Sequence, residues 1–250
     1  MNYAINKAFK EDEQQLTSFI KNFDNSGKNF GNQDRNSLKL FDLNGQTINI
    51  KSFKIPNAIN QLAYKFFRKS KAQRSFEYAN KLNNLNVGTP QPIAYYEFKT
   101  PVLFKKSYYI SEHLTYDLTY RELTTDLNYP NHEDILRAFT RFTFELHEKG
   151  INFLDHSPGN TLIQIDNGVY KFYLVDLNRM RFEPMDLQAR IKNLSRLTIQ
   201  DSLVKVMSDE YAKLYGVSYG EFYSKLWQYI NAFQDKIKRK KALKKKLLFR

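Results

Sequence analysis

The hydrophobic pattern changes its period along this chain, and the change restricts the folds open to it. Strand-like runs dominate the first hundred residues, and the first two, residues 37–41 and 47–53, flank Asn44-Gly45. Asn-Gly between two such runs is typical of a tight β-hairpin. Two further strands are expected over residues 92–98 and 102–110. The first part of the chain is therefore predicted to form a β-sheet.

Helical periodicity replaces the strand pattern in most of the remaining chain. Apolar residues recur at three- and four-residue spacing from Ser70, a suitable helix cap, to about Asn84. The same spacing runs over residues 134–149 and stops at Gly150. From about Asp186 onward the pattern is again helical. The sequence thus predicts one main helix among the early strands and a mainly helical second half.

Together the two patterns predict an α+β fold with two lobes. Residues 1–113 would form a β-rich N-lobe and residues 114–235 an α-rich C-lobe, with the chain leaving the sheet near Glu112. Residues 236–250 would follow as a basic C-terminal tail. A chain of 250 residues with 42% hydrophobic content is long enough to bury a core in such an arrangement.

Composition excludes several kinds of site. The chain has no cysteine, which excludes disulfides, thiolate metal sites and cysteine nucleophiles, and its four histidines include no H-x-x-x-H zinc pair. The N-terminus carries charges where a secretory signal needs an apolar run, and no stretch approaches the ~20 apolar residues of a membrane-spanning helix. We expect a cytoplasmic protein, with any membrane contact made at the inner face of the inner membrane.

Most of the net charge of +13 lies in the basic tail. Nine Lys or Arg and no acid occur between Lys236 and Arg250, which leaves +4 (13 − 9) for the rest of the chain. Leucines and a phenylalanine are interleaved with these cations, a pattern that favours contact with an anionic membrane surface. A solvated terminus and a tail that binds nucleic acid through charge alone are open alternatives. No specific nucleic acid is expected.

One constellation of polar residues combines the groups that phosphoryl transfer requires. Asp155 and Asn160 lie five residues apart directly after a predicted helix, the spacing of base and metal-binding amide in a kinase catalytic loop. A second hairpin, around Asp166-Asn167-Gly168, then leads to Asp176 at the end of an apolar run. A carboxylate and an amide brought together by a hairpin suit Mg²⁺, a hard ion that prefers oxygen ligands.

A cation for donor phosphates is expected on the first hairpin. Lys51 is the strongest candidate, with Glu77 on the helix after Ser70 as the carboxylate that orients it, and Lys54 is a rival. Each residue alone also has an ordinary structural explanation, such as a solvated strand lysine or a helical ion pair of Glu77 with Arg74. The order of the elements along the chain favours the joint interpretation.

Two segments resemble a known family. LHEKGINFLDHSPGNTLI, followed by YLVDLNRMRF, resembles the protein-kinase-like superfamily and, within it, the bacterial lipopolysaccharide kinase family that includes the Kdo and core heptose kinases. The segment from Ile50 to Glu97 is similar to the N-lobe of such kinases, so that the resemblance covers roughly residues 30–182. It implies a two-lobed protein-kinase-like fold and an enzyme that transfers phosphate from ATP.

The resemblance also implies roles for individual residues. Asp155 would be the catalytic base, Asn160 and Asp176 would bind Mg²⁺, and Lys51, Glu77, Gly31 and Glu112 would serve the ATP site. The implied acceptor is a lipid-linked sugar, a Kdo (3-deoxy-D-manno-octulosonic acid) unit on a lipid A precursor of lipopolysaccharide. Arg179 and Arg181, just beyond Asp176, are candidates for contacts with acceptor phosphates or carboxylates.

The sequence departs from the protein-kinase pattern at several points. It has no G-x-G-x-x-G, so residues 31–36 are only a candidate phosphate-covering loop. Phe153-Leu154 replaces His-Arg, Asp176-Leu177-Asn178 replaces Asp-Phe-Gly, and no Ala-Pro-Glu segment follows. These differences favour a small or glycolipid acceptor over a protein. Another kinase-like phosphotransferase and a membrane-associated pseudokinase are the alternatives.

Overall fold

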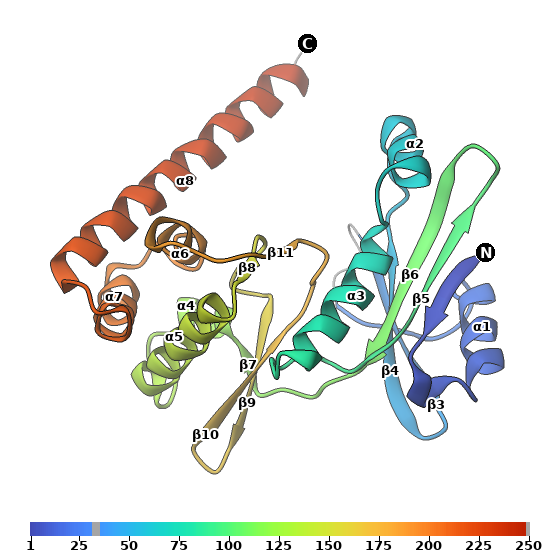
Figure 1. Cartoon of the computed structure of the whole chain (residues 1–250), viewed down its shortest axis with the longest axis horizontal. Helices are drawn as coiled ribbons and strands as arrows, with labels where there is room; N and C mark the ends of the chain where they lie inside the picture. The colour runs from blue at the N-terminus through green and yellow to red at the C-terminus, as the bar shows by residue number, and fades with distance from the viewer. Residues whose placement is uncertain (32–35, 249–250) are drawn as a thin grey trace. The chain divides into compact units, whose positions relative to one another are not determined.

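The computed structural model describes residues 1–31 and 36–248 and divides the chain into two compact units (Figure 1). The first unit comprises Met1–Thr115 together with the short segment Val175–Asn178, and the second comprises Tyr116–Leu174 and Arg179–Arg250. The first is built on a β-sheet and the second is mainly helical, as the two hydrophobic patterns predict.

The first unit contains a six-stranded antiparallel sheet in the order β1-β5-β6-β4-β3-β2. Its strands are β1 (Asn2–Ile5), β2 (Lys28–Asn29), β3 (Asn36–Leu43), β4 (Gln46–Phe53), β5 (Pro92–Lys99) and β6 (Phe104–Glu112). The hairpin predicted around Asn44-Gly45 is confirmed, since these two residues join β3 to β4 with φ of 55° and 85°. Two positive φ angles are what a two-residue hairpin turn requires.

Helices cover both faces of this sheet (Figure 1). Successive strand side chains point to opposite faces, so Tyr96 packs in one core with Leu16 and Ile20 of α1 (Glu13–Lys21), while Tyr95 packs in another with Ala72 of α3. The helix predicted after Ser70 is confirmed as α3 (Lys71–Asn84), and the Ser70 side chain accepts a hydrogen bond from the Gln73 amide at 3.0 Å.

Three helical segments of the first unit are absent from our sequence prediction. They are the 3₁₀ turn η1 (Lys7–Phe9), helix α1 and helix α2 (Ala58–Phe66), which packs on the sheet where the rings of Tyr64 and Phe104 lie 5.7 Å apart. Helix α2 begins at the cap Asn57, whose side chain accepts from the Asn60 amide at 3.0 Å. It contributes no fully buried side chain, and its apolar residues Ile59 and Phe66 are exposed.

The second unit combines helices with short strands. Its helices are α4 (Tyr120–Thr125), α5 (His132–Glu148), α6 (Leu187–Leu194), α7 (Asp201–Tyr215) and α8 (Tyr219–Leu248). Its strands are β7 (Leu118–Thr119), β8 (Ile151–Phe153), β9 (Thr161–Asp166), β10 (Val169–Leu174) and β11 (Met180–Phe182). Strands β9 and β10 form the predicted second hairpin, and α5 is the helix predicted over residues 134–149.

The core of the second unit is formed around α5. Phe139 of α5 is completely buried and stacks on Tyr120 with the ring centroids 4.1 Å apart. Helices α6, α7 and the first turns of α8 add further buried side chains, among them Leu194, Tyr211 and Phe222. This packing fixes α6 and α8 beside the loop that follows β8.

Helix α8 is a single helix of 30 residues, and it runs on through the segment from Lys236 that we treated as a separate basic tail (Figure 1). The buried side chains described in this helix lie in its first half, where Phe222, Leu226 and Ile230 join the core. Among the residues that the structure describes, no helix is long and apolar enough to cross a membrane.

Candidate functional site

Lys51 and Asp176 form an ion pair in the first unit. The Lys51 ammonium on β4 lies 2.8 Å from Oδ1 of Asp176, which belongs to the segment Val175–Asn178. The Lys51 side chain is only 16% exposed, and its ammonium also lies 5.4 Å from the centroid of the Phe53 ring. The structure thus brings together the residue predicted to bind donor phosphates and a residue predicted to bind Mg²⁺.

Asp176 is held in an unusual backbone conformation. Its φ is 58°, in the left-handed region that Asp tolerates better than most residues because its short polar side chain can bond locally. The buried amide of Asn178 donates a hydrogen bond of 2.7 Å to Oδ1 of Asp176. Backbone geometry, Asn178 and Lys51 therefore fix the direction of this carboxylate together.

In the second unit, Asp155 begins a short closed loop after β8. The side-chain amide of Asn160 donates to the backbone carbonyl of Asp155 at 2.8 Å, and the Asn160 backbone amide donates to Ser157 at 2.9 Å. The five-residue spacing noted in the sequence therefore closes the loop. The Asp155 carboxylate points outward, is 39% exposed and lies 3.6 Å from the Arg179 guanidinium.

A buried network of hydrogen bonds around Asn193 supports this loop. Oδ1 of Asn193, on α6, lies 3.2 Å from Nε2 of His147 and 3.0 Å from Nδ1 of His156, while its amide nitrogen donates to the Phe153 carbonyl at 2.8 Å. Since that oxygen only accepts, both imidazoles donate to it, and Nδ1 of His147 accepts from the Tyr211 hydroxyl at 2.7 Å.

The same burial keeps both imidazoles neutral. Desolvation lowers the pKa of His156 to about 4 and the pKa of His147 to about 3, although the hydrogen bond that each ring donates to Asn193 acts in the opposite direction. The two histidines are therefore neutral, and their hydrogen bonds to Asn193 connect α5 and α6 to the loop that carries Asp155. Both side chains are almost completely buried.

A cavity of about 680 Å³ opens beside Asp155 within the second unit. Five cationic side chains line it, together with the single carboxylate of Asp155 and apolar groups of α8. The cations are Arg179, Lys192, Arg196, Lys236 and Lys240. Arg196 is fixed in the wall, because it donates to the Leu154 carbonyl and stacks 5.6 Å from the centroid of the Phe233 ring on α8.

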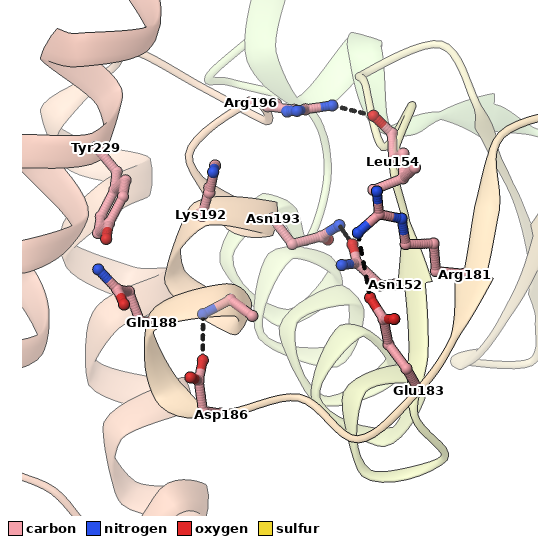
Figure 2. Close-up of a pocket in the computed structure, with 11 residues that line it drawn as sticks. Asn152, Leu154, Arg181, Glu183, Asp186, Gln188, Lys192, Asn193, Arg196 and Tyr229 are labelled. Atoms are coloured by element: carbon pink, nitrogen blue, oxygen red, sulfur yellow. Dashed lines mark hydrogen bonds and ion pairs between the residues drawn. The ribbon is translucent and has the colours of Figure 1, made fainter.

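A second cavity of about 470 Å³ adjoins the first, and Lys192, Arg196 and Tyr229 line both. Figure 2 shows Arg196 reaching the Leu154 carbonyl at one side and Tyr229 of α8 facing the α6 side chains at the other. This second cavity also contains the carboxylates of Glu183 and Asp186. Its charge is therefore mixed, whereas the cavity beside Asp155 is strongly positive.

Glu77 does not meet Lys51 in this structure. Its carboxylate pairs with the Lys69 ammonium at 2.8 Å and accepts from the Gln73 amide at 3.0 Å, while Lys51 pairs with Asp176. Lys54, the rival cation, lines a separate cavity of about 350 Å³ in the first unit. Lys51, and not Lys54, is thus the lysine that the fold brings to Asp176.

The two remaining predicted residues lie at the edges of the sheet unit. Gly31 is exposed with φ of 65°, and residues 32–35 of the candidate phosphate-covering loop lie outside the described residues. Glu112 ends β6 opposite Ile48, and its backbone amide donates to the Gln91 carbonyl at 2.9 Å. Their roles at a nucleotide remain predictions.

The donor atoms at Asp176 and Asn160 fit a magnesium ion chemically. Asp176 supplies a half-buried carboxylate that already neutralises a cation, and Asn160 is oriented through its amide nitrogen, which makes its oxygen the atom suited to a metal. The two residues belong to different units, so the fit of each to a metal is a statement about that residue alone.

Most residues of the cavity wall were not predicted as site residues from the sequence. Lys192 and Arg196 come from α6 and the turn after it, and Lys236 and Lys240 from α8. Each pair has a four-residue spacing, which places two cations on one helical face and was visible in the sequence. The direction in which that face points depends on helix packing and was not visible.

Comparison with known proteins agrees with this picture. A model of the lipopolysaccharide kinase (Kdo/WaaP) family matches residues 52–215. Among solved structures, one described as WaaP in complex with acyl carrier protein is similar with a TM-score of 0.65 at 14% sequence identity, covering 94% of this chain and 99% of that chain. No curated protein matches the sequence.

The structural similarity spans nearly the whole chain and confirms the predicted two-lobed, kinase-like α+β fold. The family match covers well over half of the 250 residues and includes Asp155, Asn160 and Asp176. Both comparisons agree with the resemblance read from the sequence. The chain therefore belongs to the lipopolysaccharide kinase (Kdo/WaaP) family.

Proposed function

We propose that this protein is an ATP- and Mg²⁺-dependent kinase that phosphorylates a sugar hydroxyl of the lipopolysaccharide inner core, on a Kdo unit of a lipid A precursor. Membership of the lipopolysaccharide kinase family supports a phosphotransferase. The observation that carries the proposal furthest is the ion pair between Lys51 and Asp176. A half-buried lysine beside a half-buried carboxylate provides a contact for donor phosphates next to a metal ligand.

Asp155 would act on the acceptor. Its carboxylate is exposed at the wall of a cavity, while its loop is fixed by Asn160 and supported by Asn193. A carboxylate held in this way orients an acceptor hydroxyl and accepts its proton late in the transfer. Positioning of this kind supplies much of the rate enhancement in phosphoryl transfer, because little covalent chemistry is required of the protein.

ATP and Mg²⁺ would be held by the residues of the sequence prediction. Lys51 would contact the donor phosphates, and Asp176 and Asn160 would bind the metal, which neutralises charge on the transferred phosphoryl group. In the structure Glu77 pairs with Lys69, so its assignment to Lys51 requires the glutamate to exchange partners when nucleotide binds.

A membrane surface is a further proposed partner, because the proposed acceptor is anchored in lipid. The cations of α8 support this assignment, since Lys or Arg near an anionic surface contribute about 1 kcal/mol each. This would place the protein at the cytoplasmic face of the inner membrane.

The function is tested by transfer of labelled phosphate from ATP to a panel of acceptors with Mg²⁺ present. Transfer to Kdo-bearing lipid A precursor is the expected result. Transfer only to a heptose-bearing core, a protein or a small molecule would assign another acceptor to the same chemistry. Binding of ATP with no transfer to any acceptor would support a pseudokinase and contradict the proposal.

A further inference from the structure

The cavity beside Asp155 has a charge distribution that an anionic ligand would complement. Apart from Asp155, the charged groups that line it are all cationic among the residues that the structure describes. Within the described part of the chain, Lys192, Arg196, Lys236 and Lys240 form no ion pair with an acid, whereas Arg179 reaches Asp155 at 3.6 Å. Cations that converge without carboxylates leave a positive potential inside a concave site.

The cations also affect one another. Burial lowers the pKa of the Arg196 guanidinium, and the nearby charge of Arg179 lowers it further. Arg196 nevertheless stays fixed, since it donates to the Leu154 carbonyl and stacks on Phe233. The wall is therefore rigid at Arg196, while the lysines reach into the cavity from α6 and α8.

Cavity size and position indicate which ligand fits. A volume of about 680 Å³ is in the range that holds a small ligand such as one or two sugar units. Asp155, the proposed base, lies in the same wall, so that a ligand bound here places its hydroxyl groups near that carboxylate. The neighbouring cavity contains Glu183 and Asp186 and is less suited to anions.

We propose that Lys192, Lys236 and Lys240 form a subsite for an anionic group of the acceptor, a phosphate or a carboxylate, and that α8 is thereby part of the acceptor site. The inference rests on the proposed kinase function and assigns its acceptor side. Lysine ammonium groups are compact charges that bind such groups without demanding one fixed orientation. The basic segment after residue 235 then has a role in recognition as well as any role at a membrane.

The test measures binding and does not depend on turnover. The ligand is the deacylated, phosphorylated headgroup of the Kdo-bearing lipid A precursor, titrated calorimetrically without nucleotide. We expect a variant with Lys192→Ala, Lys236→Ala and Lys240→Ala to bind it at least tenfold more weakly than the unmodified chain. Raising the salt concentration should weaken binding to the unmodified chain and have less effect on the variant.

Lys238→Ala is the matched control on the same helix. Lys238 is 79% exposed and lies outside the residues that line the cavity, so its removal subtracts one charge without touching the subsite. The control should bind within twofold of the unmodified chain. Equal binding by the control and the triple variant would overturn the proposal, and so would a failure of the unmodified chain to bind the headgroup. Thermal melting of each variant verifies that it is folded.

Two further arms distinguish the source of the anionic group. One uses a headgroup without its phosphates, and the other uses a headgroup without the Kdo carboxylate. If the missing group is the one that the three lysines bind, binding should no longer differ between the unmodified chain and the triple variant. Lysine-dependent binding without phosphate transfer would sustain the subsite and contradict the kinase function. Transfer to the acceptor, with headgroup binding that does not depend on the three lysines, would support the kinase function and contradict the subsite.

Discussion

At the scale of single residues, Asp176 is the most constrained group of the proposed site. It combines a positive φ of 58°, an ion pair with Lys51 and a hydrogen bond from Asn178. Each constraint acts on the direction of the carboxylate. Its exposed fraction of 31% leaves it accessible to an ion or a ligand from solvent.

We expect Asp176→Asn to remove activity while leaving the fold nearly unchanged. The amide is close to the carboxylate in shape and tolerates the same φ, but it cannot neutralise Lys51 or a metal ion. The ion pair is partly exposed, so its loss should cost only about 1 kcal/mol of unfolding free energy. Initial rates of phosphate transfer and urea unfolding measure the two effects separately. A loss of several kcal/mol with full activity would show that the pair is structural.

His156 should make stability depend on pH. Its pKa of about 4 in the fold lies below the usual 6.5, so the unfolded chain binds more protons between these values. The stabilisation is therefore complete above pH 6.5 and is lost as pH falls toward 4. The full difference corresponds to about 3 kcal/mol for this group.

Urea unfolding at a series of pH values checks this expectation with His156→Phe as the comparison. Phenylalanine suits the position because the His156 ring already lies 5.6 Å from the rings of Phe139 and Phe153. The variant should show a shallower loss of stability between pH 6.5 and 4, whatever its absolute stability. Identical slopes in the two proteins would contradict the assignment of the neutral imidazole.

At the scale of elements, the loop after β8 depends on α6. Asn193 is the connection, since it donates to the Phe153 carbonyl and accepts from two buried imidazoles. Helix α6 also places Lys192 in the cavity wall, and Arg196 follows just after it. One element thus supports the loop that carries Asp155 and lines the space beside it.

Asn193→Ala should destabilise the protein by about 2–4 kcal/mol and reduce transfer activity. The substitution leaves two buried imidazoles and a carbonyl without their partner, and each unsatisfied group costs about 1–3 kcal/mol, reduced where water can enter the space. Lys192→Ala on the same helix touches none of these groups and should unfold within about 0.5 kcal/mol of the unmodified chain. Equal stability of the two variants would show that the network is dispensable.

The sequence predicted those helices and strands whose turns and caps are determined by a few neighbouring residues. The turn at Asn44-Gly45 and the cap at Ser70 fix their hairpin and helix through backbone preferences of a few residues. Helices α1 and α2 and the two- and three-residue strands β2, β7, β8 and β11 were not predicted, because these segments are short and become regular only through packing.

The candidate site was predicted in part for the same reason. Residue types and spacing indicated Asp155, Asn160 and Asp176, and the ion pair of Lys51 with Asp176 agrees with a shared role. The partner of Glu77 was not predictable, because it depends on how α3 is rotated against the sheet, and Lys69 is nearer. The lysines of the cavity became visible only when α6 and α8 were placed.

At the scale of the whole molecule, the chain divides its proposed chemistry between two units. The first contains Lys51 and, through the returning segment Val175–Asn178, Asp176. The second contains Asp155, Asn160 and the cationic cavity. Each unit has its own buried core, and the buried side chains that the structure describes in α8 all precede the basic segment.

Two truncations should therefore separate folding from acceptor recognition. Removing residues 241–250 keeps every described residue that lines the cavity beside Asp155, so headgroup binding and the melting temperature should change little. Removing residues 236–250 keeps the core residues Phe222, Leu226 and Ile230 but deletes Lys236 and Lys240. The shorter chain should still fold and should bind the headgroup at least tenfold more weakly. Similar binding by both truncated chains would argue against a contribution of α8.

The most direct measurement is transfer of labelled phosphate from ATP, with Mg²⁺, to Kdo-bearing lipid A precursor by the unmodified chain and by Asp155→Ala. Asp155 is exposed at the start of a supported loop, so the variant should fold normally and lose transfer by a factor of a hundred or more, as expected for loss of an acceptor-orienting base. Transfer by the unmodified chain that disappears in the variant is the predicted result. Undiminished transfer by a folded Asp155→Ala chain would contradict the proposed mechanism.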